Sequence, residues 1–165
     1  MILEEFDTSL TAVINPWNII KPVEGIPRVA VACYSHVTFE RIVGELGAHI
    51  IAETSSANGI KPIYKAKYKD TEVAIFMIDV GAPMSVGMLE DVYQMGVQKV
   101  IIFGTCGVLD SSIEDCSIII PEIAVRDEGT SYHYADPTDE IGVNDKYIST
   151  CLLYTSPSPR DVEES

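Results

Sequence analysis

The sequence predicts a three-layer α/β fold with a central mixed, mostly parallel sheet and helices on both of its faces. Residues 28–33, 73–78 and 97–103 are almost continuously apolar, as strands are when both faces of a parallel sheet are covered. Segments with helical spacing alternate with such strands from Arg28 to Ile120, which is typical of βαβ units. We therefore expect these three strands to lie in one sheet.

The first half of the predicted domain begins after an irregular lead-in, residues 1–27, that three prolines interrupt. A strand at 28–33 comes first. A helix follows it, because apolar residues recur at helical spacing until Gly47 ends the pattern: Phe39, Ile42, Val43 and Leu46. After a polar loop, tyrosine and alanine alternate with lysine over 64–68, which predicts a half-exposed strand. The chain then turns back into the buried strand 73–78.

The second half begins with a helix that starts after Pro83 and ends at Gly96. Its apolar residues include three methionines, and we interpret them as core packing: Met84, Met88, Leu89, Val92 and Met95. The strand 97–103 follows, so that 73–104 forms a βαβ unit with the usual right-handed crossover. A fourth buried strand is expected at 117–120, before the polar loop 126–131.

The last part of the chain, residues 149–165, shows no periodicity and contains a Ser-Pro-Ser-Pro run. We expect it to be a disordered tail. Residues 151–161 also resemble the peptide obtained when sequencing-adaptor DNA is translated, which would make the tail an artefact. The expected domain boundaries are therefore 28–148, with 1–27 as the lead-in.

The composition is acidic, with 11 Lys and Arg against 25 Asp and Glu and a net charge of −14. Nucleic acids and anionic membranes bind clustered cations, so neither is expected as a partner. No apolar run reaches the roughly 18 residues of a spanning helix, and no basic leader is present. These features predict a cytoplasmic protein.

The cysteines and histidines do not have the spacing of a metal site. Cys33 and Cys116 lie in or beside apolar strands, which favours buried free thiols. We expect neither a metal nor an organic cofactor.

Three turns follow buried strands, at 34–36, 79–83 and 104–107. Open α/β sheets bind ligands at the carboxyl ends of their strands, so these turns are candidates for a ligand site. Gly104 and Gly107 allow close backbone approach, and Thr105 supplies a hydroxyl between them. The Thr105 hydroxyl could contact a ligand, or it could cap its own turn by bonding to nearby backbone.

The order of these turns, followed by the loop at 126–134, resembles the nucleoside phosphorylase superfamily of uridine and hexameric purine phosphorylases. The resemblance covers about residues 28–137. Its most specific motifs are Tyr68-Lys69-Asp70, Gly81-Ala82-Pro83, Gly96 and Gly104-Thr105-Cys106-Gly107. The loop after Asp127 looks most like the uridine phosphorylase branch.

This resemblance implies cleavage of the N-glycosidic bond of a purine or pyrimidine nucleoside, with inorganic phosphate as co-substrate and a pentose 1-phosphate as product. It implies phosphate binding by Gly104 and Thr105. It implies nucleoside binding by Val80, Gly81, Cys106 and Gly107. Such pentosyltransferases of nucleoside metabolism are homo-oligomers, so the resemblance also implies a homo-oligomer. It assigns no catalytic residue here.

The chain departs from the family pattern at three arginines, which are the usual bidentate phosphate ligands. Candidate replacements for these arginines are Arg28, His36, Arg41 and Lys61. Possible anion or subunit contacts are His36, Lys61 and Arg126, although His36 and Arg126 are also typical of exposed loops. A nucleosidase that uses water, or a non-catalytic truncated relative, therefore remains an alternative. The family's base-reading and ribose-binding acidic residues would lie beyond residue 165, so we expect a sheet incomplete on its carboxyl-terminal side and a chain inactive alone.

Overall fold

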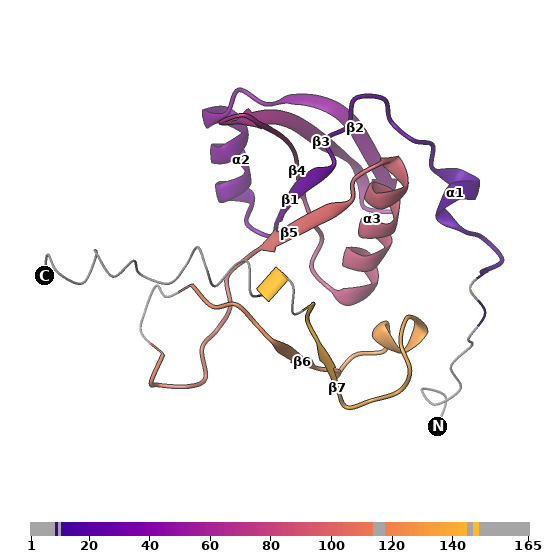
Figure 1. Ribbon diagram of the computed structural model, residues 1–165, viewed down its shortest axis with the longest axis vertical. Coiled ribbons are helices and arrows are strands. Elements are labelled where there is room, and N and C mark those ends of the chain that lie inside the picture. Colours follow the sequence, from indigo (N-terminus) through magenta and orange to yellow (C-terminus); the bar gives the residue numbers. More distant parts are fainter. Residues whose placement is uncertain (1–8, 10, 114–117, 145–146, 149–165) are drawn as a thin grey trace, which may run out of the picture. The chain divides into compact units, whose positions relative to one another are not determined.

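The computed structural model describes residues 9, 11–113, 118–144 and 147–148 (Figure 1). These residues fall into two compact units. One lies within Thr8–Gly107, and the other contains the described residues from Val108 onward. The predicted tail at 149–165 and Cys116 lie outside the described residues. Within the described part of the chain, no helix is long and apolar enough to span a membrane.

A five-stranded mixed sheet forms the centre of the larger unit. In the sheet order β2-β3-β4-β1-β5, the strands are β2 (His49–Ser56), β3 (Gly59–Tyr68), β4 (Thr71–Met77), β1 (Val29–Cys33) and β5 (Lys99–Phe103). Strand β1 runs parallel to both of its neighbours, β4 and β5. Strands β2, β3 and β4 form an antiparallel meander. The three apolar segments thus lie side by side in one sheet, as predicted.

Helices α2 (His36–Glu45) and α3 (Ala82–Met95) cover opposite faces of this sheet (Figure 1). Successive side chains of β4 point to opposite faces of the sheet and pack under different helices. Ala74 and Phe76 pack in the cluster under α3, whereas Ile75 packs in the cluster under α2. Both faces are therefore apolar, which explains the near-continuous apolar sequence of the strand. The predicted three-layer α/β architecture is confirmed.

The ends of the two helices follow from local chemistry. Ser35 caps α2 by accepting a hydrogen bond from the backbone N–H of Thr38 at 3.3 Å. Gly96 ends α3 with a φ of +126°, a conformation that favours glycine. The helix ends at Gly47 and Gly96 were both predicted from the sequence.

Four details differ from the predictions. Strand β2 was missed, because its apolar residues do not alternate and a bulge lies between Ile50 and Ala52. The lead-in carries the four-residue helix α1 (Pro16–Ile19). Residues 118–120 form no strand, and Ile118 is 78% exposed. The prediction of a fourth buried strand is therefore wrong for these residues. Strand β5 is present but half-exposed, because it is the edge strand of the described sheet.

The smaller unit contains a two-stranded antiparallel ribbon of β6 (Ile123–Val125) and β7 (Glu140–Gly142). The short 3₁₀ helix η2 (Ser131–His133) lies in the connection between them. The strands of this ribbon are too short and too exposed to bury a core of their own. Instead, the connection is organised around one buried side chain, Arg126.

Candidate functional site

An open cleft of about 740 Å³ lies where the chain leaves the carboxyl ends of β1, β4 and β5. Its lining residues come from all three turns and from the start of α3: Tyr34, Ser35, Val80, Gly81, Ala82, Ser85 and Thr105. The sheet order places β1 between β4 and β5, so the three turns converge at one edge. This is the position at which open α/β sheets bind ligands.

The turn after β5 packs against the ring of Tyr34. The backbone N–H of Tyr34 donates to the carbonyl oxygen of Phe103 at 3.1 Å, which extends the pairing of β1 with β5. Directly beyond it, a Cβ atom at Gly104 would lie 3.1 Å from Cδ2 of Tyr34. A side chain at position 104 would therefore have to push the ring of Tyr34 away by a few tenths of an ångström.

A chain of hydrogen bonds joins the Tyr34 side chain to the end of β4. The Tyr34 hydroxyl lies 2.9 Å from Oγ of Ser85, and Ser85 donates to the carbonyl oxygen of Asp79 at 2.6 Å. Ser85 is 8% exposed and lies in the first turn of α3. Tyr34 is therefore held at its backbone by β5 and at its hydroxyl by α3.

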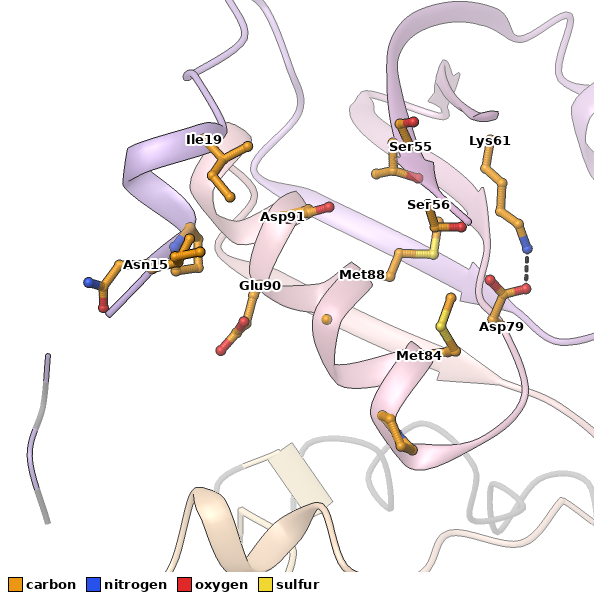
Figure 2. Close-up of a pocket in the computed structure, with 15 residues that line it drawn as sticks. Asn15, Ile19, Ser55, Ser56, Lys61, Asp79, Met84, Met88, Glu90 and Asp91 are labelled. Carbon is orange, nitrogen blue, oxygen red and sulfur yellow. Dashed lines mark hydrogen bonds and ion pairs between the residues drawn. The ribbon is translucent and has the colours of Figure 1, made fainter. Parts of the chain in front are cut away.

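The carboxylate of Asp79 forms an ion pair with Lys61 on β3 (Figure 2). The pair lies at a second, smaller pocket of about 300 Å³, which α3 and the segment around α1 also line. Met84 and Met88 give this pocket an apolar wall, and Asp91 lies on the same helix (Figure 2). Burial, together with the nearby charge of Glu90, raises the pKa of Asp91 above its usual range.

The structure brings together some of the predicted site residues and separates others. Val80, Gly81 and Thr105 line the same cleft, and Gly104 is adjacent to it through Tyr34. Cys106 and Gly107 continue the turn on an exposed stretch and are not among the residues that line the cleft.

The three candidate anion contacts lie in different places. His36 is the exposed first residue of α2, next to the cleft residue Ser35. Lys61 is paired with Asp79 at the second pocket. Arg126 belongs to the smaller unit and is only 6% exposed there.

The guanidinium of Arg126 is held entirely by neutral acceptors of its own loop. It donates to the hydroxyls of Ser131 and Thr138, both at 2.9 Å, and to backbone carbonyls of Ala135 and Asp136. Its Cζ lies 4.2 Å from the centroid of the Tyr132 ring, a cation–π contact. These contacts make Arg126 the organising residue of the connection between β6 and β7.

No metal centre is evident among the described residues, where no three of the usual ligand side chains gather. Cys33 is a buried free thiol, as predicted, and Cys106 is an exposed one.

Sequence reasoning recognised the turn at 34–36 but did not identify the two side chains that shape the cleft. The sequence pattern includes Tyr34 only as part of that turn and assigns no role to Ser85. Ser85 lies four residues after Gly81, one helical turn into α3, and its backbone N–H donates to the Gly81 carbonyl at 3.0 Å. This spacing from the candidate residue Gly81 was the signal that could have identified it.

Comparison with known proteins finds one family model and several similar proteins. Residues 28–160 match the family model described as the phosphorylase superfamily. Guanosine phosphorylase from Halorubrum lacusprofundi is 29% identical over 83 residues, which covers 50% of this chain and 34% of the relative.

Solved structures of a uridine phosphorylase from Vibrio fischeri ES114 are also similar. One superimposes with a TM-score of 0.66 at 24% identity, covering 91% of this chain and 62% of that protein. Another, a complex with 6-hydroxy-1-naphthoic acid, gives 0.67 at 25% identity, covering 86% and 60%. The chain thus spans about a third of the curated relative and three fifths of the solved proteins.

Proposed function

The chain belongs to the phosphorylase superfamily, and we propose that its protein cleaves the N-glycosidic bond of a purine or pyrimidine nucleoside, with phosphate as the attacking group. The products are a free base and a pentose 1-phosphate. In this proposal the reaction needs inorganic phosphate as co-substrate and no cofactor. The similarity to a guanosine phosphorylase and a uridine phosphorylase supports this substrate class.

The observation that carries the proposal is the convergence of Thr105 with Val80 and Gly81 in one cleft. Thr105 offers a hydroxyl donor to phosphate, and Gly104 keeps the backbone beside it free of a side chain. Val80 and Gly81 follow β4, on the other side of β1 from Thr105, and the nucleoside is proposed to lie against them. Phosphorolysis requires these two ligands side by side, because attack at the anomeric carbon depends on positioning.

The transition state of this reaction resembles an oxocarbenium ion, and the departing base carries negative charge that must be stabilised. Neither requirement calls for a covalent enzyme intermediate. Cys106 and Gly107, which continue the turn beyond the residues that line the cleft, are therefore proposed as contacts to the nucleoside, and Cys106 is not proposed as a nucleophile.

A second candidate function is a nucleosidase that uses water in place of phosphate. It is favoured by the lining of the cleft, because none of the seven described residues that line it carries a charged side chain. Phosphate is usually held by cationic side chains, whereas water needs only hydrogen-bonding groups.

The experiment that separates these functions is a screen of purine and pyrimidine nucleosides with and without inorganic phosphate. Base release that depends on phosphate supports the phosphorylase. Base release that ignores phosphate selects the nucleosidase. Because the chain spans only part of its relatives, the screen should include a protein in which this chain is extended to their length. A folded, extended protein that releases no base from any nucleoside would contradict both enzymes and indicate a non-catalytic relative.

We also propose that the protein is a homo-oligomer. The hairpin of β3 and β4, whose outer residues are polar and exposed, and the loop after Arg126 are the candidate contact surfaces. Light scattering that shows only monomer at micromolar concentration would contradict this assembly.

A further inference from the structure

The hydroxyl groups of the cleft form a chain with a single possible direction of hydrogen bonding. Ser85 has one hydroxyl proton, and it is donated to the carbonyl oxygen of Asp79, a group that can only accept. The Ser85 oxygen also lies 2.9 Å from the Tyr34 hydroxyl. Since the proton of Ser85 is already used, Tyr34 must be the donor in that second bond.

The direction of these hydrogen bonds determines whether the Tyr34 hydroxyl can donate a hydrogen bond to a ligand or only accept one. Its proton is directed at Ser85, so its phenolic oxygen presents only lone pairs to the cleft. Lone pairs attract an O–H or N–H donor and repel the oxygens of an anion. The Lys61 ammonium does not offset this repulsion, because it is paired with the Asp79 carboxylate at the second pocket.

The packing of Tyr34 keeps this arrangement in place. Its ring abuts Gly104, and its backbone N–H is bonded to Phe103. The hydroxyl cannot swing toward Thr105 without moving the ring away from Ser85, a buried residue of α3. The acceptor is therefore preorganised.

We infer that Tyr34 and Ser85 set the hydrogen-bonding polarity of the cleft: Tyr34 accepts a hydrogen bond from a pentose hydroxyl, and Ser85 prevents Tyr34 from donating to an anion. Phosphate is thereby confined to the side of Thr105. The inference rests on the proposed function only in taking a nucleoside as the ligand. The hydrogen-bonding polarity of the cleft is tested with inorganic phosphate alone, without any nucleoside.

The first arm of the test measures binding of inorganic phosphate by isothermal titration calorimetry. Ser85→Ala frees the Tyr34 proton for the cleft, so phosphate should bind about tenfold more tightly, the effect of one added hydrogen bond to a charged group. The double variant Tyr34→Phe/Ser85→Ala should lose this gain. Ser85→Thr keeps the hydroxyl and should restore the original affinity. An affinity of Ser85→Ala equal to or below that of the unchanged protein overturns the inference.

The second arm measures binding of uridine and guanosine without phosphate. Tyr34→Phe removes the acceptor, so nucleoside affinity should fall about five- to tenfold, the effect of one lost hydrogen bond. Tyr93→Phe is the matched control, since Tyr93 is an exposed residue of α3. Unchanged nucleoside affinity in Tyr34→Phe overturns the assignment of the pentose hydroxyl.

Two further results distinguish failure of the inference from unfolding of a variant and from failure of the proposed function. If circular dichroism shows that Ser85→Ala is unfolded, the inference is tested with Tyr34→Phe alone. The inference then predicts that Tyr34→Phe weakens nucleoside binding more than phosphate binding. The reverse order overturns the inference. If the unchanged protein binds phosphate but no nucleoside, the proposed function fails, whereas the comparison of phosphate affinities still decides the polarity.

Discussion

Gly104 lies directly against the ring of Tyr34, so that a Cβ atom at position 104 would be 3.1 Å from Cδ2 of the tyrosine. Few real Cβ contacts are this close. The two residues come from neighbouring parallel strands, β5 and β1, at the point where both strands end. The shape of the cleft depends on this contact.

The substitution Gly104→Ala should therefore displace the Tyr34 ring and weaken ligand binding. We expect a loss of stability of about 1–3 kcal/mol, as is typical of overpacking. Gly107→Ala is the matched control, since a Cβ there would meet no atom within 4 Å. Urea unfolding of both variants tests the prediction, and equal midpoints for the two variants would contradict it.

Thr105→Ala should weaken the use of phosphate and leave the fold intact. The lost hydrogen bond to a charged ligand is expected to cost about 1.5–3 kcal/mol, which corresponds to a change in KM for phosphate of about tenfold or more. Thr71→Ala, at the exposed start of β4, is the control. An unaltered KM for phosphate would show that Thr105 only caps its turn.

Phe76→Ala should severely destabilise the larger unit. Phe76 is fully buried in the cluster between the sheet and α3, and truncation of such a side chain costs about 3–5 kcal/mol. Phe103→Ala is a control on the same sheet, because Phe103 is 50% exposed. The free energy of unfolding, measured in urea, should fall much more for position 76 than for position 103.

Arg126→Lys should disrupt the connection between β6 and β7. A lysine ammonium cannot reproduce the fork of donors that reaches two hydroxyls and two carbonyls, and it stacks less well on Tyr132. We expect a destabilisation of about 2 kcal/mol in this unit, because the buried charged side chain that joins these four acceptors is lost. Faster hydrogen exchange of residues 123–142, with unchanged exchange in the sheet of the larger unit, would confirm it.

The loop at Glu128 should be sensitive to acid. Hydrogen bonds from Ser131 and Thr130 lower the pKa of the Glu128 carboxyl below its usual range. A lowered folded-state pKa stabilises the loop above the ordinary pKa of glutamate, and this stabilisation is lost as the pH falls through the folded-state value.

Glu128→Gln should accordingly speed amide exchange at Thr130 and Ser131 at about pH 7, and the difference from the unchanged protein should disappear as the pH falls through the lowered pKa of Glu128. Glu122→Gln is the control for loss of a carboxylate in the same unit. A difference that persists at acid pH would mean that the charge of Glu128 is not what holds the loop.

The parallel half of the sheet could be predicted from the sequence because burial on both faces leaves a recognisable apolar run. Strand β2 could not, since its pattern is broken at the bulge between Ile50 and Ala52. The run at 118–120 was misleading for the opposite reason. Its residues are apolar, but Ile118 is exposed and forms no strand, and an apolar run alone does not specify a pairing partner.

The candidate site was predictable to the level of backbone turns. Glycines and a threonine after buried strands indicated the cleft, and Val80, Gly81 and Thr105 do line it. The role of Tyr34 was not predictable, because it depends on Ser85, a residue 51 positions away that only the fold brings near. For the same reason, the ion pair of Lys61 with Asp79 was not expected.

The central position of β1 has a consequence for the order of folding. Its residue Val31 pairs with Ile75 on one side and with Ile101 on the other, so both ladders close long loops. The meander of β2, β3 and β4 joins segments adjacent along the chain, and contacts of this kind form faster than distant ones. During synthesis, the meander can assemble while β5 is still emerging. The ligand cleft, which needs all three parallel strands, is then the last part of the larger unit to be completed.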